Sequence, residues 1–344
     1  MSLFTKIPLL LSLFSLVSWA QINTESLSIG GSYLGIFNNL SQNQTQFDFA
    51  TNINLDFEVI PNLTGTIEFQ SSPGNGSLGF TGPSTVVTDL TLFYILNINN
   101  HATNLTFGSF DTAFGYETQF LSNNANTFNN LYILNSLTYA SLAGQMGTLN
   151  TLGIQVENNF DYFDITTSLS NGTAETAYNE NKSFEHLIQI STHSFINDLR
   201  LTGTYFKSDD NLDTSDSLQT DLTAILYEIN YVLLKTFEIK MKNAYLHFND
   251  QNPVTSRNDD EVITYEVEIN YNRKPFFIGL RGSFWRGLNN SAEQPNPGLA
   301  QDATSGTIDR FQLGFGSFLD PKVLVKSEII YEKYLNEFEN YGFI

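Results

Sequence analysis

The chain has 344 residues, a formal net charge of −20 and no cysteine. Its 36 acidic residues against 16 basic ones argue against a nucleic-acid partner, whose phosphates would be repelled. The lack of cysteine excludes disulfides and thiolate-held metal ions. Aromatic residues make up 14% of the chain, a share that fits either a soluble β-sandwich or a β-structure with aromatic belts at two interfaces.

Residues 1–20 have the pattern of an export signal. Lys6 provides the positive start, an apolar run follows it, and Ser18 and Ala20 are the small residues that a signal peptidase reads. We therefore expect cleavage after Ala20 and a single domain over residues 21–344. The alternative is a transmembrane anchor, which is disfavoured because the apolar run is short for a bilayer span.

Short segments with alternating apolar and polar residues fill the rest of the chain. From Phe47 to Val59 the odd positions are almost all apolar, and the even positions are polar, acidic or small. Side chains of a strand point to opposite faces in turn, so such a segment has one apolar and one polar face. We predict fifteen strands and the stub of a sixteenth, at about 25–37, 46–59, 62–71, 85–98, 103–110, 151–157, 161–170, 183–193, 199–207, 219–231, 236–248, 261–271, 275–286, 307–318 and 322–334.

The gaps between these segments alternate between short and long. The even-numbered gaps are tight, as at residues 60–61 and 272–274, whereas most odd-numbered gaps are longer and polar, as at residues 171–182. Short turns at one rim and long loops at the other are typical of a transmembrane antiparallel up-and-down β-barrel, so we predict an all-β barrel of about 16 strands. Residues 335–344 are too few for a complete crossing, and we expect a truncated sequence or an incomplete last strand.

The polar faces of the predicted strands carry ionisable side chains that would line a water-filled lumen. Acids outnumber bases among them, which favours a weak preference for cations, because rows of charge across a narrow lumen select by sign. For any one residue the alternative is simple solvation or pairing with another charge. The candidate pore-lining and constriction residues are Asp111, Glu117, Asp56, Glu58, Glu68, Glu238, Lys240, Lys242, Glu266, Glu268, Arg281 and Arg310.

The longest gap, residues 111–150, follows the fifth predicted strand. Its segment 131–140 is apolar for a solvent loop, and a structureless loop of this length is uncommon unless it has a function. We predict that this third long loop folds into the lumen and narrows it, and that Asp111 and Glu117 contribute most to selectivity. The alternative is that residues 131–140 form one more barrel strand, which would upset the even count.

One sequence element leads into this loop, namely Gly108-Ser109-Phe110-Asp111-Thr112-Ala113-Phe114-Gly115. It resembles the G-x-F-x-x-P-F-G element of porins related to the phosphate-selective porins O and P, with Ala113 in place of the proline. The resemblance implies a barrel of about sixteen strands, trimeric, that passes small solutes. Phosphate selectivity in that family needs a ladder of basic residues, and this chain is strongly acidic, so we do not carry that property over.

Motifs for cofactors, metals and catalysis are weak. Residues 74–79 match G-x-G-x-x-G, but the Gly82-Pro83 that follows cannot begin the helix of a dinucleotide site well. The acidic run 209–216 lacks the glycine and glutamate of a calcium loop, which leaves at most loose divalent-ion bridging to lipopolysaccharide. The four histidines are scattered and no G-x-S-x-G occurs, so we expect no cofactor, no metal site and no enzymatic activity.

These patterns and the resemblance together predict a porin of the Gram-negative outer membrane. It would be a passive diffusion channel for small hydrophilic solutes or ions, in contact with lipid and lipopolysaccharide and assembled as a homotrimer. Two alternatives stay open. One is a barrel with a plugged lumen that serves as a structural anchor or adhesin, and the other is a secreted soluble β-rich binding protein.

Overall fold

The computed structural model describes residues 27–40, 46–72, 84–98, 101–111, 114, 132, 137–138, 150–170, 184–193, 198–213, 218–250, 260–288, 307–320, 323–334 and 339–343. Nearly all of these residues lie in β-strands. Within these ranges, no helix is both long and apolar enough to cross a bilayer.

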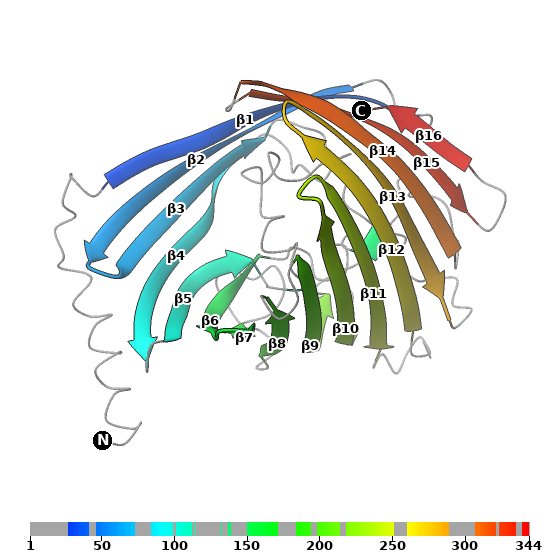
Figure 1. Cartoon of the computed structure of the whole chain (residues 1–344). Helices are drawn as coiled ribbons and strands as arrows, with labels where there is room; N and C mark the ends of the chain where they lie inside the picture. Colours follow the sequence, from blue (N-terminus) through cyan, green and yellow to red (C-terminus); the bar gives the residue numbers. More distant parts are fainter. Residues whose placement is uncertain are drawn as a thin grey trace.

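The described part of the chain forms sixteen strands, each antiparallel to its neighbours in sequence. β16 also pairs with β1, through Asn39 opposite Phe343 and Leu40 opposite Gly342, so the sheet closes into an up-and-down barrel (Figure 1). The strands are β1 (Leu27–Leu40), β2 (Gln46–Ile60), β3 (Leu63–Ser72), β4 (Ser84–Ile98), β5 (His101–Asp111), β6 (Asn150–Asn159), β7 (Phe163–Ser170), β8 (Glu185–Thr192), β9 (Leu199–Asp213), β10 (Leu218–Leu233), β11 (Phe237–Asp250), β12 (Asp260–Arg273), β13 (Phe276–Gly287), β14 (Thr307–Asp320), β15 (Val323–Tyr334) and β16 (Glu339–Phe343).

The predicted fold class is confirmed. Each of the fifteen predicted strands has its counterpart in the barrel, and the largest difference is at β9, which continues to Asp213 where the prediction ended at 207. The predicted stub corresponds to β16, a strand of five residues that pairs with the end of β15. The agreement follows from the period-two alternation, which is a local property of each strand.

Apolar side chains lie on the outside of the barrel and polar ones on the inside. On β10, Tyr227 is 62% exposed, whereas the adjacent Glu228 is 6% exposed. Ile53, on β2, is 50% exposed. An apolar belt of this extent is unfavourable in water but is solvated by lipid. Other large apolar side chains exposed on this outer surface are Ile188, Ile190, Ile229, Met241, Tyr265, Val267, Ile269, Ile278, Leu280, Phe311 and Ile329.

Part of the inner face is apolar too, which differs from the expectation that inward side chains line water. On β10 the inward residues near the long-loop end are Leu222, Ala224 and Leu226, all fully buried. Their outward neighbours Ile225 and Tyr227 are also apolar, so alternation cannot mark this stretch. The buried apolar cluster inside the barrel consists of Phe114, Leu137, Leu187, Phe206, Leu222, Ala224, Leu226, Ala244, Leu246, Val262, Trp285, Ile308 and Tyr334.

Candidate functional site

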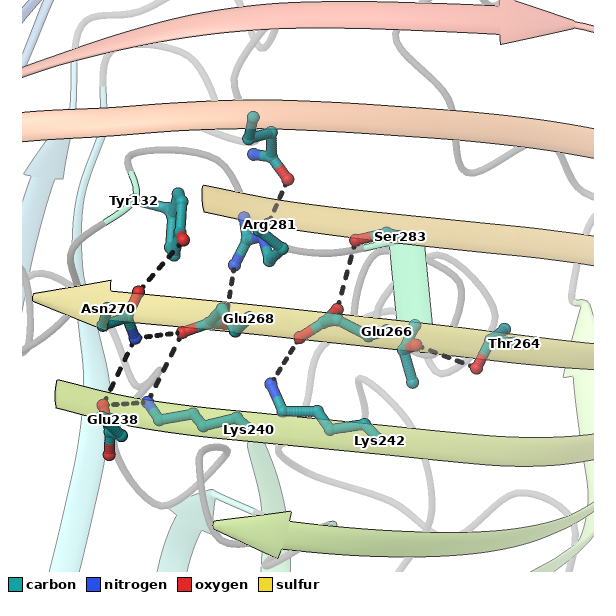
Figure 2. A network of polar contacts seen from close by, with 12 residues as sticks. Tyr132, Glu238, Lys240, Lys242, Thr264, Glu266, Glu268, Asn270, Arg281 and Ser283 are labelled. Atoms are coloured by element: carbon teal, nitrogen blue, oxygen red, sulfur yellow. Dashed lines mark hydrogen bonds and ion pairs between the residues drawn. The ribbon is translucent and has the colours of Figure 1, made fainter. Parts of the chain in front are cut away.

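Side chains of opposite charge face one another across β11, β12 and β13 on the inner wall (Figure 2). Lys242 lies opposite Glu266, with 2.8 Å between Nζ and Oε1. Lys240 lies opposite Glu268, with 3.6 Å between Nζ and Oε1, and Glu268 lies opposite Arg281. Directly opposed side chains are the nearest neighbours on one face of a sheet, so the alternation of sign makes each of these contacts attractive. We call this set the charged ladder: Glu238, Lys240, Lys242, Glu266, Glu268 and Arg281.

Neutral polar groups also donate hydrogen bonds to the ladder carboxylates. Ser283 Oγ donates to Glu266 Oε2 at 3.3 Å. Asn270 Nδ2 donates to Glu268 Oε1 at 2.7 Å and to Glu238 Oε2 at 3.3 Å. Burying a charge costs several kcal/mol unless it is both paired and hydrogen-bonded. The ladder is therefore favourable only as a set, because removal of one member leaves its partner charge buried.

The described residues between β5 and β6 include Tyr132, which contacts the ladder from inside the barrel (Figure 2). The Arg281 guanidinium is 4.0 Å from the centre of the Tyr132 ring, and Tyr132 Oη donates to Asn270 Oδ1 at 3.1 Å. Thr138 Oγ1 donates to Thr264 Oγ1 at 2.8 Å. These described residues lie inside the barrel and none of them is in a strand. The prediction of an inward-folded third loop is confirmed for them.

Gly279 makes room for the Tyr132 side chain on the inner wall because it has no Cβ. Gly279 lies opposite Asn270, and a Cβ at this position would be 2.7 Å from Tyr132 Oη and 2.6 Å from Asn270 Oδ1. Burial, together with the negative charge of Glu268, holds the pKa of the Tyr132 phenol far above its usual range, so the phenol keeps its proton and remains a donor. Nearer the start of the loop, Phe114 packs edge-on against the Phe206 ring, with 6.1 Å between the ring centroids.

A second buried ion pair extends the polar wall to β14 and β15. Arg310 lies opposite Glu332, and its Nε donates to Oε1 of Glu332 at 2.5 Å. Tyr334 Oη donates to the other oxygen, Oε2, at 2.7 Å. Arg310 is 2% exposed and Glu332 is fully buried. The wall beneath the loop is thus stabilised by paired charges on five consecutive strands, β11 to β15.

The opposite side of the barrel presents acids that remain in contact with solvent. Asp56, on β2, lies opposite Ser28 and Thr66, whose hydroxyls donate to its carboxylate at 3.5 Å and 2.8 Å. The strand registers from β3 round to β12 place Asp56 on the same inner face as the ladder. Asp56 and its neighbour Glu58 are both exposed, whereas ladder members such as Glu266 are buried.

The structure brings together seven of the twelve predicted site residues. The six ladder residues lie side by side, and Arg310 is on the adjoining strand β14. Glu68 and Asp111 belong to β3 and β5, and Glu117 lies outside the described residues. The prediction missed Tyr132, Thr138 and Gly279, although the apolar segment 131–140 gave a signal for the first two. No group of three or more His, Asp or Glu is placed to hold a metal ion within the described ranges.

No protein-family model matches the chain, and no curated protein matches it in sequence. Its fold is similar to that of several solved structures. The outer membrane channel DcaP of Acinetobacter baumannii has a TM-score of 0.63 and 9% identity, covering 94% of this chain and 98% of its own. An anion-selective porin from Comamonas acidovorans has a TM-score of 0.62 and 9% identity, covering 92% and 98%. The trimer form of OmpT, an outer membrane protein of Vibrio cholerae, has a TM-score of 0.59 and 11% identity, covering 92% and 98%.

At these levels of identity the likeness establishes the fold. The chain is a β-barrel with the architecture of outer-membrane porins and channels, which places it in a structural class without naming its solute. The fold alone does not define an activity, so function has to be argued from the lumen and its charges.

Proposed function

We propose that the protein is an outer-membrane porin, a passive diffusion channel for small hydrophilic solutes or ions. The observation that carries this proposal is the inverted polarity of the closed barrel, with an apolar outer belt and a charged, hydrogen-bonded inner wall. Lipid solvates such a belt, and the part of the polar inner wall that is exposed, as at Asp56 and Glu58, offers water and ions a route. The similarity in fold to a porin and to an outer membrane channel supports the proposal.

The proposed selectivity is a weak preference for cations. The chain carries 36 acids against 16 bases, which gives the lumen and its rims a negative potential that attracts cations. Asp111 and Glu117 are the proposed constriction acids, because Asp111 ends β5 and both precede Tyr132 in the sequence, whose side chain lies against the ladder. The likeness to the phosphate-selective porins O and P depends on the element at residues 108–115, and we propose no phosphate preference.

The proposed location is the outer membrane, reached after removal of residues 1–20. The partners would be lipid and lipopolysaccharide on the outer belt, and two further copies of the chain in a homotrimer. The trimer form described for Vibrio cholerae OmpT supports this assembly by analogy of fold. We propose no cofactor and no catalysis, since diffusion through a water-filled lumen requires neither.

Two recordings on the purified mature chain test the proposal. Liposomes that contain it are expected to swell in small sugars, and planar bilayers are expected to show unit conductance steps with a reversal potential of cation-selective sign in a KCl gradient. A barrel that is plugged as an anchor or adhesin would give neither signal, and a soluble binding protein would stay out of the bilayer. Neutralising Asp111 and Glu117 is expected to reduce selectivity, and unchanged selectivity would refute their assignment.

A further inference from the structure

The two sides of the barrel differ in what covers their inner faces. On β12 and β13 the inward residues Glu266, Ser283 and Arg281 are at most 4% exposed. On β1 and β2 the inward residues Ser28 and Asp56 are exposed. Figure 1 shows β2 to β4 and β10 to β13 on opposite sides of the barrel. Among the described residues, the inner wall is thus covered by protein at β12 and β13 and open to water at Ser28 and Asp56.

Packing explains the covered half. Tyr132 lies over Arg281 and donates to Asn270, and Thr138 donates to Thr264. Further toward the long-loop rim, the apolar cluster fills the space between this loop and β8 to β15. A solute cannot enter a region packed with buried apolar side chains, since protein interiors are close-packed.

The charges on the covered half also cancel. The ladder contains three acids and three bases, Glu238, Glu266 and Glu268 against Lys240, Lys242 and Arg281, and its pairs are in contact at 2.8 to 3.9 Å. A set of adjacent opposite charges has a short-ranged field. In this arrangement the charged ladder binds the loop through Tyr132 and contributes little to ion selection.

The open half carries acids at the corresponding height. Asp56 is four residues from the end of β2 at the short β2–β3 turn, and Lys240 is three residues from the start of β11 at the short β10–β11 turn, so the two lie at a similar level between the rims. Asp56 accepts hydrogen bonds from the hydroxyls of Ser28 and Thr66, which are neutral groups and not counter-charges. Glu58, two residues further along β2, adds a second exposed acid.

We propose that the passage runs along the inner face of β1 to β3, and that Asp56 and Glu58 are wall residues that select cations, while the charged ladder anchors the loop. This inference rests on the proposed function and deepens it, because it names the wall that the solute follows and the solute class, small cations. Two exposed acids on this wall raise the local cation concentration and lower that of anions.

Cysteine labelling tests the route, because the chain has no cysteine of its own. Ser28→Cys and Ser283→Cys make the same conservative change on the open and the covered wall, where Ser28 is exposed and Ser283 is fully buried. Each variant is recorded in a planar bilayer while a cationic methanethiosulfonate reagent is added. We expect stepwise loss of conductance for Ser28→Cys and no change for Ser283→Cys over the same exposure. The reverse pattern would overturn the inference.

Reversal potentials test the selecting residues. We expect the double variant Asp56→Asn, Glu58→Gln to lower the cation-to-anion permeability ratio about sevenfold, because losing a local potential of about kT changes the local cation and anion concentrations by about 2.7-fold each, in opposite directions. Asp161→Asn, an exposed acid in the turn between β6 and β7, is the matched control and should leave the ratio unchanged. An equal shift in both variants would overturn the role of Asp56 and Glu58. A wild-type chain that inserts but never conducts would instead refute the proposed function.

Discussion

Replacing Gly279 with alanine is expected to release Tyr132 from the wall. The new Cβ would be 2.7 Å from Tyr132 Oη and 2.6 Å from Asn270 Oδ1, closer than any carbon–oxygen contact that side chains tolerate. The ring would have to move, and its hydrogen bond to Asn270 and its contact with Arg281 would both weaken. One hydrogen bond contributes about 0.5–1.5 kcal/mol and one buried cation–π contact about 1–2 kcal/mol. Docking of the loop should therefore weaken by about 1–3 kcal/mol, or roughly 5- to 150-fold in its equilibrium.

Trp285 provides the assay for this change. The chain has two tryptophans, Trp19 and Trp285, and a chain from which the expected export signal 1–20 has been removed would contain Trp285 alone. Trp285 is fully buried in the same cluster as Phe114 and Leu137 of the loop. Acrylamide quenching of its fluorescence should increase in Gly279→Ala, and unit conductance should rise and become noisier as the loop leaves the wall.

Gly203→Ala is the matched control, because a Cβ at Gly203 meets nothing within 4 Å. It should behave like wild type in both measurements. If Gly279→Ala and Gly203→Ala gave the same quenching as wild type, Tyr132 would not be held by this wall and the reasoning from its contacts would be refuted.

Three further predictions concern the same interior. Leu137→Ala should cost about 2–5 kcal/mol of barrel stability through the cavity it leaves, measured as a lower unfolding temperature in detergent, and an unchanged temperature would show that the loop does not pack there. Glu332→Gln leaves the buried charge of Arg310 without its counter-charge and should cost about 3–5 kcal/mol in the same assay, whereas a loss below 1 kcal/mol would contradict the buried pair. Because the docked phenol of Tyr132 has a raised pKa, docking should be independent of pH below about 10 and should weaken as pH rises above it. Quenching of Trp285 fluorescence measures this between about pH 8 and pH 12, a range that brackets the ordinary pKa of a phenol. A Tyr132→Phe variant that kept the same alkaline transition would refute the assignment.

The barrel itself could be predicted from sequence because its signal is local. A segment such as 261–271 alternates residue by residue, and the alternation fixes both the strand and its two faces. The inward loop was predictable for a related reason, since the apolar segment 131–140 needed burial. The part of the wall that the loop contacts was not predictable, because the contact between Tyr132 and Arg281 joins positions far apart in sequence and depends on the curvature of the closed sheet.

The burial of the ladder could not be read from the sequence either. Lys242 and Glu266 were recognised as inward and charged, but alternation has the same form whether water or a protein segment lies in front of a wall. The buried apolar cluster inside the barrel was not predictable either, because the sequence alternation does not mark it. Around Leu222 and Leu226 both faces of β10 are apolar, so the period of two disappears from the sequence where the interior is filled.

The one-sided filling also gives the barrel unequal stiffness. From β8 to β15 the inner face carries a packed apolar cluster that includes Phe114 and Leu137 of the loop, so bending this part of the wall would require breaking close side-chain contacts. The inner face of β1 and β2 has no such backing at Ser28 and Asp56, and there the sheet alone resists deformation. We therefore expect lateral pressure from the surrounding lipid to strain mainly the strands that carry Ser28 and Asp56, so that membrane tension and lipid composition would act on the proposed route through these strands.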